Sequence, residues 1–369
     1  MVLKGILWLI AAAGLSFSAL GQGALRPVPL PDDPLEMVKG PGLEVKTPAN
    51  RAAVLKLLDR ARESYALRSS GQAYDLKVTF TVTSGGQTEF DGAWQMEDVF
   101  DPKQGLRWTA KTSAPYAITR IYSNEKLYGE ETTTHIPLRL QEARAALFDP
   151  IPSAKNIARA SIRISTTALK GAKLTCVLLS SIAEKKAAGA TPWRRWDETE
   201  ECIDPQSGLL RTHSQVPGRY YSYSYANGPQ FAGHLMPRKV TVTEAGQTVT
   251  KISVDSLTEL PGADPSLFVP TEEMKARGRA TAMTGAQKIF RVFDRGASAP
   301  GAAAHVVCVF GVVTPSGQLV EAHSLQPSDP NSQAALDAAK QMSFSQPSVP
   351  GDYPQQHFVF VIEQFVSSP

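Results

Sequence analysis

The chain has 369 residues, and 38 Lys and Arg against 35 Asp and Glu leave a formal net charge of only +3. Nonspecific nucleic-acid binding depends on many contacts between cations and phosphates, so this near-neutral balance indicates no nucleic-acid partner. Hydrophobic residues make up 42% of the sequence. This is the composition of a globular protein, and the length is sufficient for two domains.

The amino terminus has the pattern of an export signal. A short basic start up to Lys4 precedes an apolar stretch over residues 5–20, and Ala19 and Gly21 are the small residues of a cleavage site. The stretch is shorter than the roughly 20 apolar residues that a membrane-spanning helix needs. We therefore expect residues 1–21 to be a signal peptide cleaved after Gly21, and the protein to be exported to the periplasm or cell envelope. An uncleaved inner-membrane anchor is the alternative.

Export bears on the three cysteines, because disulfides form in oxidising compartments. Cys176 lies in an apolar, strand-like run, and Cys202 lies just before an Asp-Pro turn. We predict a disulfide between Cys176 and Cys202, with two buried free thiols as the alternative. Cys308 lies within an apolar run and is expected to be buried and unreactive.

Residues 22–45 carry five prolines and predict an extended arm, after which a large strand-rich region begins. Thr47 and Pro48 are a hydroxyl cap and a first-turn proline, which together predict the start of a helix. Apolar residues then alternate with polar ones over 76–82 and again over 90–96, which predicts a hairpin. Further strands are expected at 106–111, 116–123, 157–169, 173–182, 209–215, 220–225, 237–244 and 248–257, with one short helix at 137–148.

This order predicts an α+β fold in which a curved antiparallel half-barrel sheet over residues 46–271 lies over helices. Residues 272–304 are rich in Ala, Gly and Arg and are expected to be a linker. A compact unit follows at 305–369. Its expected elements are strands at 305–313, 318–324 and 357–366, with a helix at 332–342 before the last strand.

The unit at 305–369 resembles the TonB carboxy-terminal domain. The resemblance rests on Gly311, the turn at 315–317, the helix around residues 335–339, Phe344, and a closing aromatic strand. It implies a small α/β domain that binds an envelope protein partner, with an outer-membrane receptor as one candidate. The candidate partner-binding edge is the last strand, which could accept an extended partner chain along Phe358, Phe360 and Ile362.

The larger region is similar to the carrier fold of LolA-like proteins. The shared features are the opening helix, the pattern Phe90-x-Gly92-x-Trp94, the turn at 204–209, the segment 235–237 entering a strand, and the segment 264–268. The resemblance implies a half-barrel that can house acyl chains. Its candidate cavity residues are Leu76, Phe80, Trp94 and Tyr223, for which ordinary core packing is the alternative.

Motifs for catalysis or cofactor binding are missing from the sequence. It contains no nucleophile elbow, no helical HExxH, no phosphate-binding GxxxxGK[ST] and no GxGxxG after a strand. We therefore expect no catalytic residue, no cofactor and no metal site. The sequence favours a non-enzymatic envelope protein in which a TonB-like module binds a partner in envelope transport. The alternative is a carrier of lipid, lipoprotein or another apolar ligand in the half-barrel cavity.

Overall fold

A computed structural model describes residues 42–84, 89–113, 115–169, 172–180, 194–297, 305–345 and 353–368. The predicted signal peptide and most of the predicted arm lie outside the described residues. Within the described part of the chain, no helix is both long enough and apolar enough to span a membrane.

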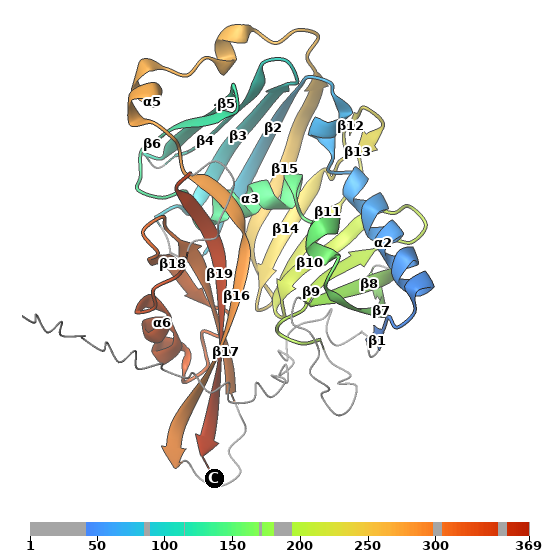
Figure 1. Cartoon of the computed structure of the whole chain (residues 1–369), viewed down its shortest axis with the longest axis vertical. Coiled ribbons are helices and arrows are strands. Elements are labelled where there is room, and N and C mark those ends of the chain that lie inside the picture. The colour runs from blue at the N-terminus through green and yellow to red at the C-terminus, as the bar shows by residue number, and fades with distance from the viewer. Residues whose placement is uncertain are drawn as a thin grey trace, which may run out of the picture.

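A single large antiparallel sheet of 13 strands forms most of the molecule. Figure 1 shows this sheet curving around helix α3 (Leu138–Phe148), with helix α2 (Pro48–Glu63) alongside. The predicted curved antiparallel sheet over helices is confirmed. In sheet order the strands are β1 (Leu43–Glu44), β7 (Ser161–Leu169), β8 (Ala172–Ser180), β9 (Thr199–Ile203), β10 (Leu210–Val216), β11 (Arg219–Ser224), β14 (Lys239–Glu244), β15 (Gln247–Glu259), β2 (Tyr74–Val82), β3 (Gly92–Asp101), β4 (Gly105–Thr112), β5 (Ala117–Ser123) and β6 (Lys126–Glu131).

Smaller elements join or flank these strands. The short strands β12 and β13 form a separate ribbon, and several single turns of helix lie in the connections. Their bounds are β12 (Gln230–Phe231), β13 (His234–Leu235), η1 (Leu67–Ser70), α4 (Ala154–Ile157), η2 (Pro265–Phe268) and α5 (Glu272–Arg277).

The alternation in the sequence explains the inner face of the large sheet. Along β2, Val78, Phe80 and Val82 are buried, while the intervening residues are exposed. Phe80 lies opposite Trp94 of β3, and their rings stack with centroids 5.3 Å apart. The period-2 pattern therefore places one face of the hairpin in the core and the other in water.

The two helices on this face form for different reasons. At the start of α2, the Thr47 hydroxyl accepts a hydrogen bond from the Asn50 amide at 3.2 Å, as its cap position predicts. Helix α3 has no side-chain cap of its own, and nine of its 11 residues are buried. Helix α3 is therefore held in place by tertiary packing on all sides.

A second sheet of four strands forms the carboxy-terminal part of the chain, in the order β16-β19-β17-β18. One face packs against α6 through residues such as Val309 and Ala335, and the other packs against the half-barrel through Phe310, Phe360 and Trp196. The bounds are β16 (Ala282–Ala297), β17 (His305–Val313), β18 (Leu319–Ser324), α6 (Ser332–Lys340) and β19 (Gln355–Ser368).

The predicted linker at 272–304 is wrong for residues 282–297. This segment is strand β16, which pairs in parallel with β19 from Ala282 opposite Gln355 to Ala297 opposite Ser368. Ile289 and Phe290 pack against the two cores on either side of the sheet. The strand was not predicted because its few apolar residues lie in a segment that is rich in Ala and Gly.

The extra strand also corrects the predicted partner-binding edge. Strand β19 lies between β16 and β17, so both of its backbone edges are already paired. The side chains of Phe358, Phe360 and Ile362 are buried in the core shared with the half-barrel. The last strand is therefore an inner strand whose aromatic face is already covered.

The predicted disulfide is confirmed. Cys176 on β8 and Cys202 on β9 face each other in adjacent strands and are bonded. Cys308 is a buried free cysteine, as expected.

Candidate ligand pocket and the two arginine clusters of α3

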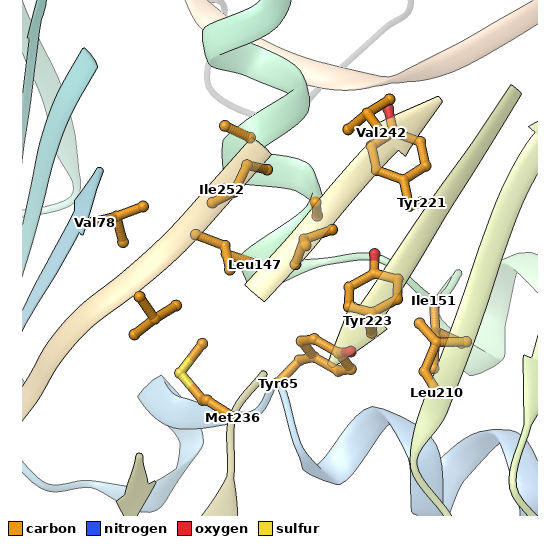
Figure 2. Packing of buried hydrophobic residues seen from close by; sticks show 14 of the residues in the cluster. Tyr65, Val78, Leu147, Ile151, Leu210, Tyr221, Tyr223, Met236, Val242 and Ile252 are labelled. Carbon is orange, nitrogen blue, oxygen red and sulfur yellow. The ribbon is translucent and has the colours of Figure 1, made fainter. Parts of the chain in front are cut away.

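A pocket of about 220 Å³ opens between the region after α2 and the carboxyl end of α3. Three of its residues, Tyr65, Phe148 and Ile151, also contact the hydrophobic core of the half-barrel. Figure 2 shows Tyr65, Ile151 and Tyr223 next to one another at this part of the core. The pocket is lined by Arg62, Tyr65, Ala66, Arg68, Ser69, Phe148, Asp149, Pro150 and Ile151.

Local chain geometry places the pocket walls. Turn η1 ends at Gly71, whose φ of +70° is a left-handed conformation that favours glycine, and the chain then enters β2. The Tyr65 hydroxyl lies 2.6 Å from the Tyr225 hydroxyl on the inner face of the sheet. Tyr65 is thereby fixed as the wall where pocket and core meet.

Arg68 and Arg62 are the two cations of the pocket lining. Arg68 donates to the Tyr74 hydroxyl at 3.3 Å and to Asp98 Oδ2 at 3.2 Å, and its guanidinium lies 4.8 Å from the centre of the Phe148 ring. Its side chain is nevertheless 40% exposed. Arg62 pairs with Asp59 and donates to the Pro152 carbonyl at 2.6 Å.

Arg68 belongs to a buried group that we call the pocket cluster, consisting of Arg68, Asp98 and Arg144. Asp98 is fully buried and also accepts from Arg144 at 2.9 Å. The Arg144 guanidinium lies 4.0 Å from the Trp108 ring centre. Burial lowers the pKa of Arg144, and repulsion from Arg68 acts in the same direction. Two guanidiniums therefore share one buried carboxylate, and the next carboxylate that acts on Arg68 is Asp149 at the pocket rim.

The rim of the pocket carries one carboxylate, Asp149. Partial desolvation raises the pKa of Asp149, and the charge of Arg68 opposes this shift. The residues that line the pocket thus include two arginines and one aspartate.

A second cluster lies at the other end of α3, and we call it the seam cluster: Arg139, Glu142, Arg219 and Glu244. Arg139 donates to Glu142 at 3.0 Å and to Glu244 at 2.5 and 2.9 Å, and Arg219 pairs with both carboxylates. Despite burial, the two arginines lower the pKa of Glu244 to about 2. Burial raises the pKa of Glu142, and both arginines oppose that shift. The cluster thus holds one carboxyl group for each arginine.

The carboxy-terminal sheet covers the seam cluster. Phe310 on β17 lies 5.7 Å from the Arg139 guanidinium and 5.2 Å from that of Arg219, measured to the ring centre. Phe360 on β19 lies 5.9 Å from the Arg219 guanidinium. Aromatic faces attract desolvated guanidiniums, so this sheet completes the environment that the arginines require.

The same sheet also holds the start of α3. Glu321 on β18 accepts a hydrogen bond from the Leu138 amide at 3.0 Å and lies 2.8 Å from His135 Nε2. Gln356 accepts from the Ile136 amide at 3.0 Å. Helix α3 has no side-chain cap from its own segment, and Glu321 fills that role across the interface.

A bulge in the small sheet aims Glu321 at the helix. Glu321 has a φ of +47°, which is unusual for a residue with a side chain. The register of β17 against β18 shifts between Phe310 and Val312, and a Cβ on the intervening Gly311 would lie 2.9 Å from the Val320 carbonyl oxygen. Gly311 thus permits the close approach that the bulge requires.

The four predicted cavity residues, Leu76, Phe80, Trp94 and Tyr223, all lie in the half-barrel core, and none of them lines the pocket. Each is at most 3% exposed, so the alternative of ordinary core packing describes their present state. Tyr223 contacts a residue of the lining, with its ring centroid 6.0 Å from that of Tyr65.

Sequence reasoning missed the polar side of the pocket. Arg62 and Arg68 lie in a stretch with several other arginines, and no spacing marks these two. Phe148 is the last residue of the helix predicted at 137–148, and Asp149 directly follows it, so no motif marked either residue as part of a site. Only the packing of α3 against η1 brings the two segments together.

No family model matches the chain, and no curated protein matches it significantly. Solved structures do match. They include a LolA superfamily protein from Nitrosomonas europaea (10% identity, 58% of this chain and 97% of that chain, TM-score 0.36) and a DUF1329 family protein from Desulfovibrio piger (9% identity, 58% and 97%, TM-score 0.37). A putative outer membrane lipoprotein-sorting protein domain from Vibrio parahaemolyticus is similar at 10% identity over 58% of this chain and 96% of that chain, with a TM-score of 0.34.

With identities of 9–10% and TM-scores below 0.5, these structures transfer no function to this chain. The resemblance of residues 305–369 to a TonB domain stays a prediction.

Proposed function

We propose that this chain is an exported, non-catalytic carrier of the cell envelope that binds an apolar chain, such as the acyl part of a lipid or lipoprotein, in the half-barrel. The observation that carries the proposal is the continuity of the pocket with the core. Tyr65, Phe148 and Ile151 line the pocket and also contact the hydrophobic core behind it. Apolar walls with a few polar groups at the opening are typical of ligand sites.

The size of the pocket sets a condition on binding. About 220 Å³ lies below the roughly 300–1,000 Å³ of typical small-molecule sites. A long chain therefore requires a core side chain such as Tyr223 to move and extend the pocket inward. The carrier hypothesis is favoured over partner capture by the last strand, because that strand has no free edge.

The proposal is tested by titrating the purified full chain with the fluorescent apolar probe 1-N-phenylnaphthylamine. We expect saturable binding that Ser69→Trp weakens at least tenfold, because an indole at this exposed lining position would fill the opening. Glu63→Trp adds the same ring to an exposed position that is not part of the lining. It serves as the matched control and should leave binding unchanged.

Two results would contradict the carrier function. One is the absence of saturable probe binding to the folded chain, and the other is equal binding by the Ser69→Trp variant and its control. Native mass spectrometry of protein purified from the envelope adds an independent test, since a carrier should retain an apolar ligand of defined mass.

A further inference from the structure

We propose that the mouth of the pocket is an oxyanion site, which makes the ligand of the carrier an amphiphile with a carboxylate or phosphate headgroup. This inference rests on the proposed function and names the class of ligand. It starts from the charge balance at the two ends of α3. The seam cluster holds two carboxylates for two arginines, whereas the pocket cluster holds one carboxylate for two.

Arg68, which shares Asp98 with Arg144, is accessible at the pocket. Asp98 is fully buried and faces Arg144, while Arg68 reaches from Asp98 to the surface with 40% of its side chain exposed. Arg68 uses Nε for Tyr74 and Nη2 for Asp98, and no described residue accepts a hydrogen bond from its Nη1. A guanidinium with a free N–H in a partly dehydrated site is a strong donor to an oxyanion.

The surroundings hold Arg68 in place for this role. Its guanidinium lies against the Phe148 ring and is hydrogen-bonded to Tyr74 and Asp98. The side chain therefore has little conformational freedom left to lose when a ligand binds. Arg62 adds a second positive charge to the lining, although its own pair with Asp59 offsets part of it. Tyr65 and Ile151 add apolar surface to the same lining and belong to the hydrophobic core.

Asp149 opposes the binding of anions at this site. It is the single carboxylate among the described residues that line the pocket. A bound anion would meet repulsion from Asp149, so the aspartate limits how tightly anions are held. Removing its charge should therefore strengthen anion binding, and Asp149 is an exposed residue.

The test compares three competitors of the fluorescent probe on the full chain: decanoate, decanol and inorganic phosphate. Decanoate and decanol share the apolar chain and differ in charge. We expect decanoate to displace the probe at about tenfold lower concentration than decanol, as one charge-assisted hydrogen bond predicts. Arg68→Met should reduce this ratio to near one. Arg60→Met, at an exposed arginine outside the lining, should retain it.

The Asp149→Asn variant gives a test that does not depend on losing an arginine. We expect it to raise the ratio of decanoate to decanol affinity by about two- to fivefold. Inorganic phosphate distinguishes the two sources of the anion. Weak competition by phosphate assigns the site to a headgroup, and competition equal to that of decanoate assigns it to a free anion.

The inference and the carrier function fail in different ways. Equal displacement by decanoate and decanol, unaffected by Arg68→Met and Asp149→Asn, would overturn the oxyanion site and leave the carrier function intact. Failure of both decanoate and decanol to displace the probe, together with phosphate binding that Arg68→Met abolishes, would overturn the carrier and leave the anion site.

Discussion

Helix α3 carries a buried arginine cluster at each end, and the two clusters differ in balance and in cover. At its amino end, the seam cluster pairs two arginines with two glutamates beneath Phe310 and Phe360 of the carboxy-terminal sheet. At its carboxyl end, two arginines share Asp98, and the cluster reaches the surface at the pocket. A covered cluster with one carboxylate for each arginine needs no further partner, whereas a cluster that is open to the surface and shares one buried carboxylate between two arginines can accept an anion from outside.

The carboxy-terminal sheet contacts α3 at the amino end of the helix. Its aromatic face and its Glu321 bind the amino half of α3, yet the pocket lies at the far end of the same helix. The sheet therefore fixes α3 without closing the pocket.

The largest expected effect comes from Asp98→Asn in the pocket cluster. This change leaves Arg68 and Arg144 without a carboxylate, and removing one partner of a buried ion pair costs up to about 5 kcal/mol. We expect that loss in the free energy of unfolding, measured by urea denaturation. Because the pocket is open, phosphate or decanoate should restore part of the stability. If neither anion raises the stability of the variant, the claim that this cluster is open to the solvent is contradicted.

Glu142→Gln gives the seam cluster the two-to-one charge ratio of the pocket cluster. One carboxylate remains for Arg139 and Arg219, so we expect a smaller loss of about 3 kcal/mol in the same urea measurement. The carboxy-terminal sheet blocks access, and added phosphate should give no rescue. Glu272→Gln, at a side chain that is 85% exposed, is the control and should change stability by less than about 0.5 kcal/mol.

Glu321→Ala removes the cap that the carboxy-terminal sheet provides for α3. Loss of a charged acceptor at a helix start predicts a destabilisation of about 2 kcal/mol. Hydrogen exchange should accelerate at the amides of Leu138 and its neighbours. Asp337→Ala on the exposed side of α6 is the matched control. Unchanged exchange at the start of α3 would show that Glu321 does not hold the helix.

The smallest effect that we expect is a dependence of the stability on pH, caused by Lys288. It crosses the same interface, where its amine donates to the Asp197 carbonyl at 3.0 Å and to Thr199 at 3.2 Å. Burial lowers the pKa of Lys288 to about 7, with Arg194 acting in the same direction and Asp197 opposing it.

The sign follows from proton counting. Between pH 7 and the ordinary lysine pKa of about 10.4, the unfolded chain binds more protons than the folded chain, so stability rises with pH across this range. Since the side chain is only partly buried, we expect a gain on the order of 1 kcal/mol that Lys288→Met removes. A slope of the opposite sign in urea midpoints measured from pH 7 to 10 would contradict the assigned pKa.

Much of the architecture was predictable because its signals are local. The alternation at 76–82, the Thr47 cap and the apolar run around Cys176 each report a periodicity or a turn that a short segment determines by itself. Strand β16 was missed because its apolar core, around Ile289 and Phe290, lies within a segment of linker-like composition. Because β16 was missed, β19 was predicted to be an edge strand. The sequence of one strand does not show which other strands pair with it.

The sequence by itself determined most strands and helices of the half-barrel, and it indicated the Cys176–Cys202 bond. The tertiary structure alone decided the charge balance of the two clusters and the place of the pocket. Asp98 and Arg144 are 46 positions apart, and Arg139 and Glu244 are 105 apart. Folding removes a charged side chain from water, and it decides whether an opposite charge lies beside that side chain. Only then is it settled whether the side chain is paired within the protein or can bind a ligand.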